Sequence, residues 1–384
     1  MKRLPRTSAD QLLLDLINTP LDTGRLEQLL SQGVDWDRFY LQAARHELLP
    51  LVYQGLKQVS AYLPLDVLDH YQHCYAANTL RNLQLRNELR GLLLEFSKAE
   101  IPVIPYKGPV LAETVYGDLA LRMFRDLDLL VPVDRVRQAV ERLEGLGYRL
   151  EAKWSEKRWP SLLKTVNHLL LRHQETGWAV EVHWLVFHPM YALPFDLEPY
   201  WADLRGRETG GKTTLTHEDQ LLLICAHGTK HHWELLKWIV DVRQLVNSFA
   251  DLDWQSLWDE ATRNGLCRCL LMGLELAGRI GDYKVPLSMQ QKVRADPVVR
   301  GLADSAWAAL FRRSIGRRRF LWEYHFYLRS RERFRDRVKQ VGCWLLYPRL
   351  EDWLAFPAGD RFFLLFVLGR PLRVGWERLV RPLL

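Results

Sequence analysis

Several features that would place this sequence in a special class are scarce or missing. Five cysteines in 384 residues are too few, and too irregularly spaced, for a disulfide framework or a paired CxxC zinc site. We find no internal repeat or low-complexity linker, and 48% of the residues are hydrophobic, which excludes a wholly disordered or collagen-like chain. The sequence predicts a globular protein of two or three compact units in a reducing compartment.

Long apolar runs are also missing. Asp10 and Asp15 interrupt the first apolar stretch, so no secretion signal is predicted. The longest late apolar run, residues 362–369, is far shorter than the roughly 20 residues that a membrane-spanning helix needs. We therefore expect a cytoplasmic protein without a transmembrane segment, which leaves peripheral contact with a membrane open.

Positive charge is concentrated near the C-terminus. The chain carries a net charge of +7, yet residues 312–384 hold 17 Lys and Arg against 7 Asp and Glu, a net of +10. This Arg-rich segment is interleaved with Trp, Tyr and Phe, which suits an anionic partner such as a membrane surface, nucleic acid or polyphosphate. A solvated basic helix is the alternative interpretation.

The hydrophobic periodicity divides the chain into four predicted parts. They are an N-terminal helical unit (1–100), a catalytic core (101–205), a helical unit packed on that core (206–300) and a basic, aromatic-rich helical segment (301–384). Ser8 or Thr7 is expected to cap the start of the first helix. The predicted fold class is α+β, a small mixed sheet flanked by helical units.

The core has a strand–turn–helix pattern followed by further strands. A strand-like run after Ile101 ends at the Lys107–Gly108 turn, and a later strand contains Asp126 and Asp128. A helix over 134–146, capped by Asp134, comes next. Residues 167–173 and 178–187 then predict a hairpin, and a helical stretch is predicted from Thr216 to beyond residue 280.

Asp126 and Asp128 are the first candidate functional residues. Two residues apart on a strand, they share one face of the sheet, where like charges repel unless a cation lies between them. Glu181 and His183 share a face in the hairpin, and Glu181 becomes a third ligand if its strand lies next to the first. Three carboxylates suit Mg²⁺, which recruits substrate phosphates, so the pattern predicts phosphoryl or nucleotidyl transfer.

Basic residues near this acidic pair are candidates for binding phosphates. The Lys107–Gly108 turn ends a strand and begins a helix, where backbone N–H groups and the Lys charge favour an anion. Arg122 and Arg125 could neutralise a triphosphate or the leaving pyrophosphate. Arg122 serves equally well as a structural counter-ion to Asp118 or Asp126.

Two further motifs have competing interpretations. Residues 206–213, GRETGGKT, fit a phosphate-binding loop pattern, but the flanking sequence lacks the strand and helix of such a loop and favours a polar loop. His227 and His231 are one helical turn apart, a spacing able to bind zinc, although Gly228 occupies the Glu position of a HExxH motif.

The stretch that carries these histidines is expected to pack on the core. Asp241 is predicted to lie on the same helical stretch as these histidines. Lys230 or His231 is predicted to contact nucleotide, and a purely structural role is the alternative.

Together these motifs resemble a known superfamily. The run IPVIPYKGPVLAETVYG from residue 101, the pattern R-x-x-x-D-L-D-L-L-V from Arg122, and the later LGY and VEVHW are similar to the DNA polymerase beta-like nucleotidyltransferases. Within that superfamily the chain resembles a bacterial group of uncharacterised nucleotidyltransferases, over roughly residues 10–250. The superfamily normally has Gly-Ser or Gly-Gly at the turn where this chain has Lys107–Gly108, as the subgroup has it.

The resemblance implies an activity and a set of metal ligands. Asp126 and Asp128 would hold two Mg²⁺ ions, with Mn²⁺ as an alternative, and Glu181 would replace the usual third Asp with a longer arm. The donor would be an NTP, ATP above all, the acceptor a hydroxyl-type group on a small molecule, peptide or protein, and pyrophosphate the product. Family members often accompany bacterial biosynthetic clusters.

Two other functions stay open at this point. One is a non-catalytic nucleotide-binding or scaffold protein on the same fold, and the other is an RNA-directed transferase, which the basic C-terminus suggests.

Overall fold

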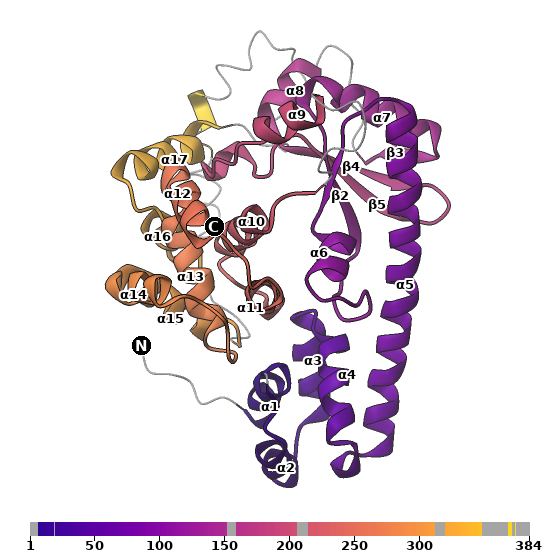
Figure 1. Ribbon diagram of the computed structural model, residues 1–384, viewed down its shortest axis with the longest axis vertical. Helices are drawn as coiled ribbons and strands as arrows, with labels where there is room; N and C mark the ends of the chain where they lie inside the picture. The colour runs from indigo at the N-terminus through magenta and orange to yellow at the C-terminus, as the bar shows by residue number, and fades with distance from the viewer. Residues whose placement is uncertain are drawn as a thin grey trace. The chain divides into compact units, whose positions relative to one another are not determined.

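The computed structural model describes residues 7–18, 20–151, 159–205, 214–311, 319–347, 368–370 and 373. These residues are mostly helical and contain a five-stranded mixed sheet with flanking helices (Figure 1). The α+β fold class predicted from the sequence is confirmed.

The chain forms two compact units, each made of several segments. The first unit comprises Met1–Leu93, Pro105–Leu127 and Thr214–Ser330, and the second comprises Leu94–Ile104, Asp128–Thr213 and Arg331–Leu384. The boundary falls within strands β1 (Ile104–Tyr106) and β2 (Asp126–Leu130). The four-part division expected from the sequence remains a prediction.

The first unit is built from helices. Its N-terminal helix α1 (Ser8–Ile17) is capped by Thr7, whose Oγ1 accepts a hydrogen bond from the Asp10 N–H at 3.2 Å, while the Asp10 carboxylate accepts one from the Thr7 N–H. The remaining helices described here for this unit are α2 (Thr23–Ser31), α3 (Trp36–Arg45), α4 (Leu49–Gln58), α5 (Leu65–Lys98, which continues into the second unit), α6 (Gly108–Thr114), α10 (His217–Lys230), α11 (Leu236–Ser248), α12 (Trp254–Asn264), α13 (Cys267–Ala277), α14 (Leu287–Ala295), α15 (Pro297–Ala309) and α16 (Arg319–Ser330).

Thr216 caps α10 as predicted, since its side chain accepts from the Asp219 N–H. The prediction that one helical stretch carries His227, His231 and Asp241 is wrong, however. Helix α10 ends at Lys230, and the chain turns through left-handed backbone at His232 and Trp233 before α11 begins.

Packing of Trp233 explains this break. The Trp233 side chain is fully buried, and its ring lies so close to Gly228 that an added Cβ would come within 2.6 Å of it. Gly273 of α13 makes room on another side, where an added Cβ would lie 3.2 Å from the same ring. Burial of this large ring offsets the cost of about 1–3 kcal/mol for each strained backbone position.

The second unit holds most of the sheet, whose strand order is β1-β2-β5-β4-β3. Strands β3 (Tyr148–Leu150), β4 (His168–His173) and β5 (Ala179–His183) pair antiparallel in succession, which confirms the predicted hairpin. The unit also contains α7 (Val136–Gly145), which packs on β3 and β5, and α8 (Trp159–Thr165), α9 (Glu198–Arg205) and α17 (Phe334–Leu346).

The predicted cap of α7 is wrong. Asp134 lies in a 3₁₀ turn (Val133–Arg135), and helix α7 starts after it with Arg135 at the capping position and no side-chain cap. Asp134 and Arg135, which the sequence pattern assigned to the first turn of the helix, belong to the 3₁₀ turn that follows Pro132.

Candidate functional site

An acidic cluster forms where β2 and β5 lie side by side in the sheet. The Val131 N–H, just after β2, donates to the His183 carbonyl at 2.8 Å, which sets the two strands against each other. The Nε2 atom of His183 lies 3.1 Å from Oδ1 of Asp128 and 2.9 Å from Oε2 of Glu181. Two carboxylates from different strands therefore meet at one position, as the sequence predicted for Asp128 and Glu181.

This cluster is shielded from solvent on the β2 side. Asp128 is 6% exposed and His183 3% exposed, whereas Glu181 keeps partial access to water. Burial raises the pKa of Glu181, but the hydrogen bond with His183 and the neighbouring imidazoles outweigh it and leave this pKa lowered. Glu181 is therefore ionised at neutral pH, the state in which a carboxylate binds a cation.

His168 completes the acidic cluster, which we define as Asp128, His168, Glu181 and His183. The antiparallel register pairs His168 with His183, and their rings stack with centroids 4.7 Å apart. One ligand atom each from His168, Glu181 and His183 lies within 4.8 Å of the others. The sequence placed His183 beside Glu181 without a role and missed His168, which only the hairpin register could have indicated.

Asp126 begins β2, two residues before Asp128, and is partly exposed. The alternation of a strand places both carboxylates on one face. The predicted Lys107–Gly108 turn is confirmed, because Lys107 follows β1 and α6 begins at Gly108. An added Cβ at Gly108, whose φ is +32°, would lie 3.2 Å from the Asp126 carbonyl oxygen, so glycine favours the close approach of this turn to the start of β2. Arg125 is exposed, immediately before the strand.

The first unit also brings together a basic cluster, which we define as Lys107, His227, Lys230 and His231. Burial, followed by the charges of Lys230 and Lys107, lowers the pKa of His231 to about 3. Burial and Lys107 also lower the pKa of His227 well below its ordinary value. The cluster thus combines ammonium groups with neutral imidazoles, a set that can bind phosphate oxygens and donate hydrogen bonds.

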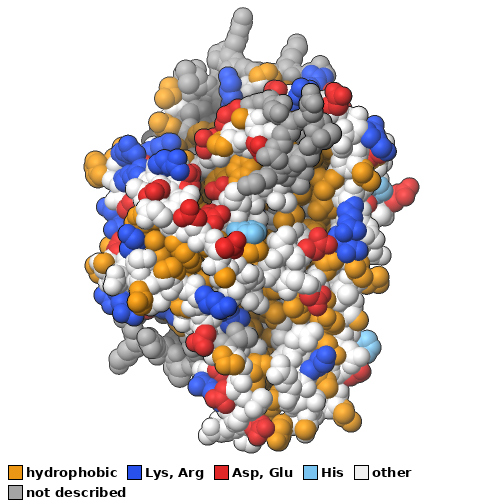
Figure 2. Space-filling model, in the orientation of Figure 1, with side chains coloured by type: hydrophobic (Ala, Val, Ile, Leu, Met, Phe, Trp, Pro, Cys, Tyr) orange, Lys and Arg blue, Asp and Glu red, His pale blue; other side chains and the backbone are white. Residues whose placement is uncertain are grey.

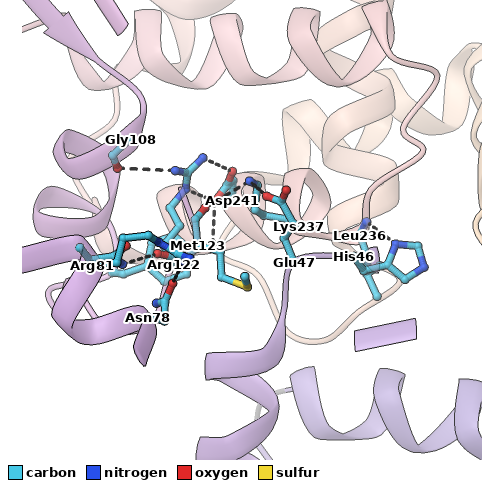
Figure 3. Close-up of polar contacts among 12 residues, drawn as sticks. His46, Glu47, Asn78, Arg81, Gly108, Arg122, Met123, Leu236, Lys237 and Asp241 are labelled. Carbon is cyan, nitrogen blue, oxygen red and sulfur yellow. Dashed lines mark hydrogen bonds and ion pairs between the residues drawn. The ribbon is translucent and has the colours of Figure 1, made fainter. Parts of the chain in front are cut away.

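Arg122 has a structural partner that the sequence did not indicate. Its Nε and second terminal nitrogen donate to the two Asp241 carboxylate oxygens at 2.9 Å and 3.0 Å (Figure 3). The Tyr116 hydroxyl donates to the same carboxylate at 2.6 Å. The expected pairing of Arg122 with Asp118 or Asp126 is therefore wrong.

Burial of this ion pair ties the segment before β2 to α11. Arg122 is 6% exposed and Asp241 2% exposed; burial lowers the pKa of Arg122, but Asp241 together with Tyr116 and Glu47 outweighs it and leaves this pKa raised. Nearby, Lys237 pairs with Glu47 and donates to the Met123 carbonyl at 3.2 Å (Figure 3). These contacts position the polypeptide just before Asp126, while a nucleotide contact by Arg122 stays a prediction.

The GRETGGKT loop, residues 206–213, lies outside the described residues.

Comparison with known protein families decides the class of the protein. A family model described as uncharacterised nucleotidyltransferase matches residues 32–282. The chain belongs to this family. The matched region contains the acidic and basic clusters, so this nucleotidyltransferase is an enzyme of the transferase class that takes a nucleotide substrate. Curated proteins and solved structures provide no match. Within the described part of the chain, every helix is too short or too polar to cross a membrane.

Proposed function

We propose that this nucleotidyltransferase moves a nucleoside monophosphate from an NTP, ATP in the first instance, to a hydroxyl-type acceptor and releases pyrophosphate. The acceptor would be carried by a small molecule, a peptide or a protein. The single observation that supports this most is the convergence of Asp128 and Glu181 on one position beside His183.

The acidic cluster suits a divalent cation. Asp128 and Glu181, with Asp126 at the start of the strand, offer the carboxylate oxygens that Mg²⁺ prefers. His168 and His183 add imidazole nitrogens, which Mn²⁺ accepts more readily than Mg²⁺. A bound divalent ion would supply charge neutralisation on the phosphates and an easier deprotonation of the acceptor.

In the proposed reaction the acceptor oxygen attacks the α-phosphorus. A new oxygen–phosphorus bond forms, the bond to the β,γ-pyrophosphate breaks, and the acceptor proton passes to solvent. Lys107 and Lys230 would bind the phosphate oxygens, and the neutral imidazole of His231 would hydrogen-bond the nucleotide. Exposed Arg125 would neutralise the departing pyrophosphate.

The alternatives receive less support. A scaffold that merely retained the fold has no need for Glu181 to approach Asp128, and the two carboxylates share one histidine nitrogen. An RNA-directed reaction rests on the basic C-terminus, of which residues 312–318, 348–367, 371–372 and 374–384 lie outside the described part.

The described part of that basic segment favours contact with an anionic membrane surface instead. On α17, Phe334, Val338, Val341 and Leu345 follow one another at helical spacing and are between 38% and 78% exposed. Arg335 and Lys339 flank this apolar face, and Lys and Arg side chains gather over α17 at the upper left of Figure 2. An exposed apolar stripe beside cations is typical of a helix that lies on anionic lipid.

The activity can be tested by incubating the protein with α-labelled ATP, CTP, GTP or UTP, Mg²⁺ or Mn²⁺ and a cell extract. We expect label on an acceptor, and a loss of at least about 10²-fold in Asp126→Asn, Asp128→Asn and Glu181→Gln. Glu175→Gln, an exposed change in the turn of the same hairpin, is the matched control and should retain activity. Undiminished transfer in the three variants would rule out the metal assignment.

A further inference from the structure

A second group of metal-ligating side chains lies in the first unit, away in sequence from the acidic cluster. His232 and Glu234 come from the turn between α10 and α11, and Glu323 comes from α16. One ligand atom from each of the three lies within 4.8 Å of the others. We call these residues the turn cluster.

Contacts outside the turn cluster hold both the turn between α10 and α11 and helix α16 in place. The fully buried ring of Trp233, packed against Gly228 and Gly273, fixes the left-handed backbone at His232 and Trp233. The Tyr327 hydroxyl of α16 donates to the Lys230 carbonyl at the end of α10. Packing and a hydrogen bond outside the cluster therefore help to position the backbone that carries the three ligands, which is how preorganised sites are built.

The surroundings of His232 strengthen electrostatic attraction. Its side chain is 7% exposed and lies among the rings of Trp322, Phe326 and Tyr327, with centroids 5.2, 5.3 and 4.6 Å away. Glu234 and Glu323 are partly exposed. The aromatic side excludes water and lowers the local dielectric, while the carboxylate side leaves a route for an ion.

The donor set selects the class of ion. One imidazole and two carboxylates are ligands that Zn²⁺ uses, with a water molecule at the fourth position. Ligand atoms around a tetrahedral Zn²⁺ lie roughly 3.4 Å apart, so side-chain adjustments on the order of 1 Å would close the cluster. The two carboxylate charges are balanced by the charge of one divalent ion.

We propose that His232, Glu234 and Glu323 bind a divalent transition-metal ion, with Zn²⁺ the best fit, which fastens α16 to the turn between α10 and α11. This site is distinct from the acidic cluster and serves stability rather than transfer. Two of its ligands, His232 and Glu234, lie on either side of Trp233 in the turn after α10. Helix α10 carries His227 and Lys230.

The test adds Zn²⁺ to metal-free full-length protein. Calorimetry and bound-metal analysis measure the binding, and thermal unfolding measures its effect on stability. Wild type should bind Zn²⁺ and unfold at a higher temperature with it. Glu323→Gln and Glu234→Gln should each weaken this binding at least about 10-fold. Substitution of residues that only hydrogen-bond a metal ligand already lowers metal affinity by that factor. Glu323→His, which restores a ligand, should recover the binding.

Two controls separate this cluster from other metal-binding groups. His325→Gln removes an exposed imidazole from the same helix α16 and should bind Zn²⁺ as wild type does. Asp128→Asn, in the acidic cluster, should keep the Zn²⁺-induced thermal shift that Glu323→Gln loses. Equal affinity, stoichiometry and thermal shift in wild type, Glu234→Gln and Glu323→Gln would overturn the proposal.

Discussion

Individual histidines of the first unit are held neutral by burial. His46 is fully buried, and its Nδ1 accepts a hydrogen bond from the Leu236 N–H at 3.2 Å (Figure 3). Burial, followed by the charge of Arg45, lowers the pKa of His46 to about 3. In the unfolded chain the same imidazole takes up a proton below a pH of about 6.5.

The lowered pKa of His46 predicts acid sensitivity. Below about pH 6.5 the unfolded state binds one more proton at His46 than the native state, so the free energy of unfolding falls as the pH decreases toward 3. Between pH 6.5 and 5 this residue accounts for a loss of about 2 kcal/mol.

Urea unfolding of wild type and His46→Asn across pH 7 to 5 measures this loss. Asn can still accept from Leu236 but does not titrate, so the variant should have the shallower pH dependence. Parallel stability curves for the two proteins would contradict the assignment.

Residue-scale features of the site were predictable to different degrees. The alternation of β2 and β5 predicted that Asp128 and Glu181 meet if the two strands are neighbours, and the strand order supplies that condition. The role of His168 depends on the register of β4 against β5, and the partner of Arg122 lies 119 residues away at Asp241. Neither is encoded in local spacing.

At the scale of elements, local sequence signals identified β1, β2 and the β4–β5 hairpin but misjudged two helix ends. Thr216 and the Lys107–Gly108 turn were found because capping and turn chemistry act over a few residues. The end of α10 is set by Trp233 packing against Gly273 on another helix, which hydrophobic periodicity does not report.

The exposed apolar face of α17 carries the prediction at this scale. Val338 is 55% exposed at the centre of that face, so Val338→Asp should leave the fold intact and abolish cosedimentation with phosphatidylglycerol-containing vesicles. Val133→Asp changes a 51% exposed valine in the same unit and is the matched control, expected to bind as wild type does. Equal sedimentation of wild type with and without vesicles would argue against membrane contact.

At the scale of the whole molecule, the chain belongs to a nucleotidyltransferase family and carries one acidic and one basic cluster. The family match covers residues 32–282 and thus reaches across both units. Carboxylates gather at the acidic cluster, while Lys107 and Lys230 lie together in the basic cluster. We infer that the acidic cluster binds divalent cations and that the basic cluster binds phosphates. Nucleotidyl transfer needs both kinds of binding site.

Nucleotidyl transfer is distinguished from transfer of the terminal phosphate by two labels followed in one reaction. Wild-type protein is incubated with a divalent metal, an acceptor-containing extract and ATP labelled at either the α- or the γ-phosphate. If the protein transfers a nucleotidyl group, the α label moves to the acceptor and the γ label leaves in pyrophosphate. An acceptor that carries the γ label, with the α label retained in ADP, would contradict it.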